Sequence, residues 1–198
     1  MNILALDCET LTHNKGSPYD SRNYLVCYSW AAFEYEQAFR WVYDDGLSRE
    51  DVQYAIEQQD LIVFFNGKFD IHWLEKAGCD FSKIKIWDVQ IAEFILSNQT
   101  APFPSLNETC IKYNIPTKLD VVKTEYWDKG VQTDEIPWPV LSDYAAHDAK
   151  VTLLCYYAQL KLMTPQQIKL CQLMCQDLYI LKEMECNGQP VEVYNFGY

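Results

Sequence analysis

Two carboxylates stand two residues apart near the start of the chain, at Asp7 and Glu9. In a β-strand, this spacing places both side chains on the same face. Carboxylates this close repel each other and are costly to bury unless a cation offsets their charge. Oxygen ligands of this kind suit Mg²⁺ or Mn²⁺. The pair indicates a metal site, and the alternative for the pair alone is a strand end that has reached solvent.

A third carboxylate, Asp70, follows an apolar run of strand length at residues 61–65. Gly67 permits a sharp turn from strand to helix, so Asp70 is expected in the first helical turn. It would then lie at the same end of the sheet as Asp7. The helix dipole alone also explains an aspartate at this position. Asn66 is equally well explained as a turn residue.

A fourth carboxylate, Asp148, lies four residues after Tyr144, so the two share one face of a predicted helix. Ala145 and Ala146 keep this helix slim where it approaches the sheet. The stripe that carries Asp148 otherwise faces the core, so its carboxylate needs a partner. That partner is either a cation or a buried ion pair.

The elements that must position these side chains follow from the hydrophobic pattern. Strands are expected at residues 3–10, 24–33, 38–43, 61–65 and 84–87, and helices at residues 48–58, 69–77, 89–96, 105–113, 140–160 and 165–186. A hairpin of strands followed by alternating strands and helices predicts an α/β fold with a mixed five-stranded sheet and helices on both faces. Residues 114–137 are expected to form a loop excursion.

Several other residues have a structural interpretation, and some of them also have a functional one. Ser48 is expected to cap the first helix, and Asp88 to cap the third or to support the site from behind. Trp127 and Trp138 are candidates for stacking on bases or for packing against the protein. His147 is interpreted as a residue of the helix surface.

The bulk composition limits the possible partners. With 16 Lys and Arg against 28 Asp and Glu, the chain carries a net charge of −12. Phosphate backbones are held largely by cationic side chains, so either nucleic acid is not the ligand, or bound cations and a partner protein supply positive charge. Eight cysteines without metal-site spacing are expected to be small buried hydrophobes. No leader or membrane span is recognised, so a reducing cytoplasm and no membrane partner are expected.

Three motifs together resemble a known family. Residues 6–10 (Leu-Asp-Cys-Glu-Thr), 66–70 (Asn-Gly-Lys-Phe-Asp) and 144–148 (Tyr-Ala-Ala-His-Asp) match, in order, the three exonuclease motifs of the DEDD superfamily of 3′–5′ exonucleases, which has a ribonuclease H-like fold. The histidine form of the third motif needs His where this chain has Asp143, so the tyrosine branch is indicated. Within this superfamily, the chain resembles the proofreading domains of family A DNA polymerases, including those of bacteriophages.

The resemblance implies a division of the chain and a set of roles. Residues 1–160 are expected to form the exonuclease domain, and residues 161–198 a C-terminal helical extension, in which residues 181–191 resemble the junction to a polymerase domain. Two Mg²⁺ (or Mn²⁺) ions are expected, held by Asp7, Glu9, Asp70 and Asp148. Tyr144 is expected to position the attacking water. Substrate contacts are expected from Thr10, Asn66 and Lys68, although a solvated helix-start lysine is the alternative for Lys68.

The implied activity is removal of nucleoside 5′-monophosphates from single-stranded DNA 3′ ends, as proofreading for a DNA polymerase domain or subunit. The expected compartment is the cytoplasm, of a bacterial host cell if the chain is phage-encoded. One alternative is an RNA-trimming 3′–5′ exoribonuclease of the same superfamily. Another is a catalytically silent interaction module that retains the fold. A nucleotide-binding Rossmann domain is set aside, because no glycine-rich loop follows the first strand.

Overall fold

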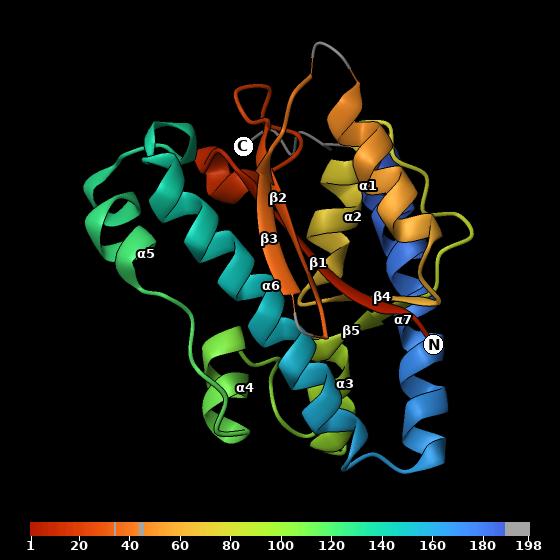
Figure 1. Cartoon of the computed structure of the whole chain (residues 1–198). Helices are drawn as coiled ribbons and strands as arrows, with labels where there is room; N and C mark the ends of the chain where they lie inside the picture. Colours follow the sequence, from red (N-terminus) through yellow and green to blue (C-terminus); the bar gives the residue numbers. More distant parts are fainter. Residues whose placement is uncertain (34, 44–45, 189–198) are drawn as a thin grey trace, which may run out of the picture.

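A mixed five-stranded sheet forms the centre of the molecule (Figure 1). The structure is a computed structural model that describes residues 1–33, 35–43 and 46–188. The strands are β1 (Ile3–Thr10), β2 (Leu25–Ala32), β3 (Tyr35–Arg40), β4 (Leu61–Phe64) and β5 (Ile86–Asp88), in the spatial order β3-β2-β1-β4-β5. β1, β2 and β3 pair antiparallel, whereas β4 and β5 continue the sheet in parallel to β1. The predicted ribonuclease H-like α/β architecture is therefore confirmed.

The central strand β1 is apolar along its first half because both of its faces are covered. Leu4, Ala5 and Leu6 are buried, as expected for a strand with helices above and below it. Its parallel pairing with β4 involves only Ile3 to Ala5, whereas its antiparallel pairing with β2 extends to Thr10. The second half of β1 therefore has no β4 neighbour, and this open edge is where its two carboxylates lie.

Helices cover both faces of the sheet, as predicted. They are α1 (Leu47–Glu57), α2 (Gly67–Lys76), α3 (Val89–Leu96), α4 (Leu106–Lys112), α5 (Val121–Glu125), α6 (Trp138–Leu160) and α7 (Pro165–Asn187). The long helix α6 packs on β1 to β4, and the Ser29 hydroxyl fixes it to β2 by donating to the Ala145 carbonyl oxygen at 2.8 Å. α2 packs against β1 and β4, on the side of the sheet opposite to α6 (Figure 1).

Asp88 ties the starts of two helices together at the end of β5. Its Oδ1 accepts hydrogen bonds from the backbone N–H groups of Gln90 (2.8 Å) and Ile91 (3.2 Å), so it caps α3 as predicted. Its Oδ2 accepts from Gly67 N–H at 2.7 Å at the start of α2. One buried carboxylate therefore fixes the turn that leads from β4 to Asp70.

Three predicted boundaries are wrong. β3 begins at Tyr35 rather than at residue 38, because Tyr35 already pairs with Ala32 of β2. Residue 34 of the expected link lies outside the described residues. Ser48 does not cap α1: the N-cap is Gly46 in a left-handed conformation, and the Ser48 hydroxyl accepts from Val42 N–H at 2.8 Å. β5 is shifted two residues towards Asp88.

The last helix belongs to the same hydrophobic core as the sheet. Cys171 and Cys175 of α7 are fully buried, and Asp88 N–H donates to the Cys175 sulfur at 3.2 Å. All eight cysteines are free thiols, and seven are buried, as predicted. The boundary at residue 160 stays a prediction, and residues 189–191 of the expected polymerase junction lie outside the described residues. Among the described helices, none combines the length and the hydropathy that a membrane span requires.

Asp88→Ala is predicted to lower the free energy of unfolding by about 2–4 kcal/mol, because it removes a helix cap and leaves buried N–H groups of two helices without an acceptor. Chemical denaturation followed by circular dichroism measures this. Ser105→Ala, which removes the capping box of the exposed start of α4, is the matched control and should cost less than half as much. Equal losses in the two variants would contradict the role of Asp88 as a link between α2 and α3.

Candidate active site

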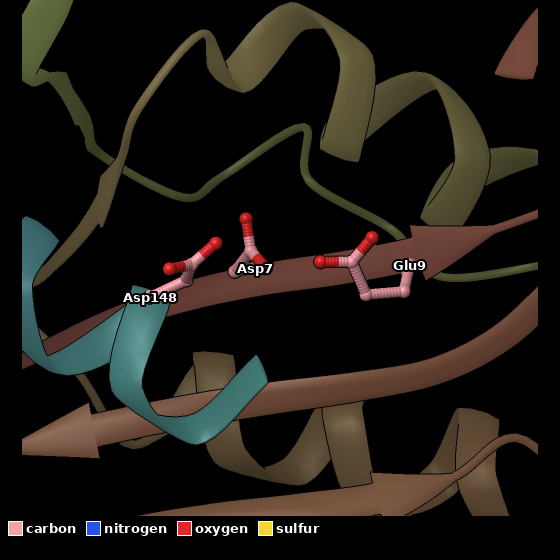
Figure 2. Close-up of side chains that lie close together, drawn as sticks. All are labelled: Asp7, Glu9 and Asp148. Atoms are coloured by element: carbon pink, nitrogen blue, oxygen red, sulfur yellow. The ribbon is translucent and has the colours of Figure 1, made fainter. Parts of the chain in front are cut away.

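Three of the four predicted carboxylates meet in one cluster (Figure 2). Asp7 and Glu9 project from β1, and Asp148 reaches them from α6, which crosses the sheet above the strand. One carboxylate oxygen from each residue lies within 4.8 Å of the others. The close-up shows Asp7 between the other two carboxyl groups. The spacing of two on the strand and the core-facing stripe on α6 therefore converge as the sequence predicted.

Asp70 lies next to this cluster but is not one of its three members. Its Oδ1 accepts a hydrogen bond from Cys8 N–H at 2.9 Å, on the stretch of β1 that β4 does not reach. Only 3% of Asp70 is exposed. Burial, followed by the nearby charge of Asp7, raises the pKa of Asp70 well above its ordinary value, against the hydrogen bonds from Cys8. Asp70 thus approaches Asp7 from the α2 side of the strand.

The cluster holds more negative charge than its hydrogen bonds satisfy. Asp7 Oδ2 and Asp148 Oδ1 are buried and have no hydrogen-bond partner within the described part of the chain. Burial and the charge of Asp148 raise the pKa of Asp7 to about 7. Burial and Asp7 raise the pKa of Glu9 well above its usual range. Carboxylates under this mutual repulsion are arranged to receive a cation.

A lysine from the 114–137 segment enters the cluster. Lys118 forms an ion pair with Asp148, whose side chain is only 2% exposed. Its ammonium group also lies 5.2 Å from the centre of the Tyr144 ring. Burial alone would lower the pKa of Lys118, but Asp148, Glu9 and Asp7 together raise it, so the ammonium group stays charged.

Tyr144 lies one helical turn before Asp148 and contacts the same cluster. The Tyr144 hydroxyl and the Asp148 carboxylate lie close enough for each to shift the pKa of the other. Burial first, and then the charges of Glu9 and Asp148, raise the pKa of the phenol well above its ordinary value, so Tyr144 stays protonated. The Trp127 ring packs edge-on against the Tyr144 ring, with centroids 5.6 Å apart, which fixes its orientation.

The 114–137 segment closes over the end of β1. It contains the short helix α5 and two 3₁₀ turns, η2 (Trp127–Lys129) and η3 (Thr133–Glu135), within the loop that was predicted. The Thr133 hydroxyl donates to the Thr10 carbonyl oxygen at 2.7 Å and accepts from Trp127 Nε1–H at 3.2 Å. One chain of contacts therefore runs from β1 through Thr133 and Trp127 to Tyr144.

The other predicted residues lie around the cluster. Thr10 is buried at the end of β1, and Asn66 is exposed in a left-handed conformation (φ 61°) at the N-cap of α2. Lys68 pairs with Glu185 of α7 at 2.5 Å. Trp138 packs under the Arg40 guanidinium, 4.6 Å from the ring centre. The substrate contacts expected from Thr10, Asn66 and Lys68 stay predictions.

His147 is not simply a surface residue. It is half-buried, and its Nε2–H donates to the Thr117 carbonyl oxygen at 2.7 Å, beside Lys118. Lys118 itself and Thr133 were missed in the sequence, and Trp127 was named there only as a candidate for stacking or packing. The only signal was the high charge of residues 114–137, since no spacing rule connects a loop lysine to a carboxylate 30 residues later.

The residues present fit a divalent cation. The donor set consists of carboxylate oxygens, which Mg²⁺ and Mn²⁺ prefer, and two of these oxygens are buried with no hydrogen-bond partner among the described residues. Asp7, Glu9 and Asp148 would hold one ion. Asp70, whose pKa responds to the charge of Asp7, is the residue that would serve a second.

Comparison with known proteins agrees with this geometry. The family model described as 3′–5′ exonuclease matches residues 1–165. A DNA polymerase of Bacillus phage SP01 is 28% identical over 144 residues, which are 69% of this chain and 16% of that polymerase. The chain therefore spans about one sixth of the length of this relative.

Solved nuclease structures share the fold. NrnC of Brucella melitensis bound to pGG superimposes with a TM-score of 0.70 at 16% identity, covering 99% of this chain and 90% of NrnC. The same protein with bound Mg²⁺ gives a TM-score of 0.65 at 15% identity over the same shares. The catalytic core of RRP6 from Trypanosoma brucei gives 0.60 at 18% identity, covering 91% of this chain and 45% of that one.

The fold and its acidic cluster define a nuclease of the ribonuclease H-like class. More narrowly, the chain belongs to the 3′–5′ exonuclease family.

Metal binding is predicted to stabilise the chain. Mg²⁺ at about one hundred times its dissociation constant should add about 2.7 kcal/mol, a rise in Tm of roughly 5–10 °C for a chain of this size. In Asp7→Asn, the neutral amide relieves the repulsion, so the metal-free Tm should rise and the metal-induced shift should disappear. Differential scanning calorimetry with and without Mg²⁺ measures both effects. An unchanged Mg²⁺ shift in Asp7→Asn would show that the ion binds elsewhere.

Proposed function

We propose that this chain removes nucleoside 5′-monophosphates one at a time from DNA 3′ ends, as the proofreading nuclease of a DNA polymerase. The observation that carries the proposal is the convergence of Asp7, Glu9 and Asp148 on one site, with buried oxygens that have no hydrogen-bond partner in the described part of the chain. Membership of the 3′–5′ exonuclease family supports the direction of attack. The phage polymerase among its relatives supports the link to DNA synthesis.

The chain's own residues would prepare the reaction. Asp7, Glu9, Asp70 and Asp148 would hold two divalent cations. When bound, such ions polarise a phosphodiester, lower the pKa of an attacking water and stabilise the departing 3′ oxygen. Tyr144 remains protonated, so its hydroxyl can orient the water that attacks phosphorus, while Trp127 holds the ring in place. Thr10, at the end of β1, and Asn66, at the start of α2, are proposed to contact the terminal nucleotides.

The acidic net charge supports dependence on a partner. Cationic side chains supply most of the affinity for phosphate backbones, and this chain carries an excess of 12 negative charges. The site can engage a single-stranded end with few contacts. Tight binding to a primer is therefore assigned to a polymerase domain or subunit that presents the 3′ end.

A primer assay tests the activity itself. A 5′-labelled single-stranded DNA incubated with Mg²⁺ or Mn²⁺ should shorten into a ladder from its 3′ end. Asp7→Ala should reduce the rate to background, and Tyr144→Phe by about a hundredfold, because one proton-positioning group is lost. Glu57→Ala, an exposed change at the end of α1, is the control and should leave the rate unchanged. Absence of any ladder with either metal would support a catalytically silent module instead.

A second candidate substrate is RNA, which the NrnC complex with pGG favours. We expect single-stranded DNA to be degraded at least about tenfold faster than RNA of the same sequence. The reason is that a DNA-specific site excludes the 2′-hydroxyl. Initial rates under the same metal conditions measure the ratio. Faster degradation of RNA would replace the proofreading proposal with an RNA-trimming one.

A further inference from the structure

Lys118 occupies an unusual position for a loop lysine. It comes from the irregular segment before α5, yet its ammonium group pairs with Asp148, a carboxylate of the metal-binding cluster. Lys118 therefore supplies positive charge where the donor set calls for a divalent cation.

The peptide group between Thr117 and Lys118 is fixed at both of its polar atoms. Lys118 N–H donates to Asn107 Oδ1 of α4 at 2.9 Å. The preceding carbonyl, that of Thr117, accepts from His147 Nε2–H of α6 at 2.7 Å. Helices α4 and α6 thus hold this peptide group against the site. The Lys118 ammonium group can still change its partner by rotation about the bonds of its side chain.

Asp148 cannot serve Lys118 and a divalent cation equally well. Its Oδ2 pairs with Lys118, and its Oδ1 is buried with no hydrogen-bond partner among residues 1–33, 35–43 and 46–188. A doubly charged ion between Asp148, Asp7 and Glu9 attracts these carboxylates more strongly than one ammonium group does, and it also repels that ammonium group. The displaced ammonium group then needs another anion within the reach of a tethered lysine. The phosphate of a bound nucleotide is such an anion.

We propose that Lys118 is a phosphate-binding residue of this active site, held in reserve on Asp148 until a divalent cation takes that carboxylate. The proposal rests on the proposed nuclease function and adds a residue to it. Lys68, which pairs with Glu185 on α7, stays a second candidate for contact with phosphate.

Two binding measurements test the two halves of the proposal without turnover. Isothermal titration with Mg²⁺ alone, near pH 8, should give a dissociation constant about tenfold lower for Lys118→Met than for the unchanged chain, because a competing cation is gone. At saturating Mg²⁺, titration with thymidine 5′-monophosphate should give binding about tenfold weaker for Lys118→Met, because a charge-assisted contact is lost.

Two further variants keep the result interpretable. Lys123→Met removes the same charge from an exposed position five residues along the same segment, and it should change neither constant. Lys118→Arg keeps the charge, and it should restore most of the nucleotide affinity. Circular dichroism checks that each variant is folded. If Lys118→Met folds poorly, the unchanged chain is compared with Lys118→Arg instead. The Mg²⁺ affinity of Lys118→Arg should stay near that of the unchanged chain.

The outcomes are distinct. Mg²⁺ binding by Lys118→Met that is no tighter, or nucleotide binding that is no weaker, overturns the proposal. A nucleotide affinity that falls equally in Lys123→Met also overturns it, because the effect would then be one of net charge. If the unchanged chain binds neither Mg²⁺ nor the nucleotide and yields no ladder, the nuclease function itself has failed.

Discussion

The repulsion between buried carboxylates is the constraint on which the rest of this structure depends. Asp148 is buried and Asp7 and Glu9 are half-buried beside it, and burial and mutual charge raise the pKa of Asp7 to about 7. Such a cluster persists only because rigid elements impose it and a cation offsets it. The central strand and the 23-residue helix α6 supply the rigidity. Lys118 supplies the positive charge in the metal-free chain.

The packing around the cluster serves to hold its members in place. β4 ends early, and the open edge of β1 is closed by Asp70 rather than by another strand. Asp88 fixes the turn that delivers Asp70. On the other face, Ser29 anchors α6 to the sheet near Ala145, so that Tyr144 and Asp148 reach β1. The site therefore relies on hydrogen bonds between elements that are distant in sequence.

The sequence predicts those parts of the site that obey a local period. Asp7 and Glu9 follow the two-residue period of a strand, and Tyr144 and Asp148 follow the four-residue spacing of a helix, so their shared faces could be inferred directly. Boundaries were less predictable: the position of Tyr35 depends on its pairing with Ala32, and the role of Ser48 on a bond to Val42. Lys118 and Thr133 were out of reach, and Trp127 could be named only as a candidate for stacking or packing, because long-range packing places all three and no local pattern records it.

The location of the cations tests the central claim most directly. Crystals of the chain grown with Mn²⁺ would reveal each ion by its anomalous scattering. We expect one ion between Asp7, Glu9 and Asp148 and a second between Asp7 and Asp70, with Lys118 no longer paired with Asp148. The contradicting result would come from well-diffracting crystals grown at saturating Mn²⁺. In it, Asp148 remains paired with Lys118 and the carboxylates bind no Mn²⁺.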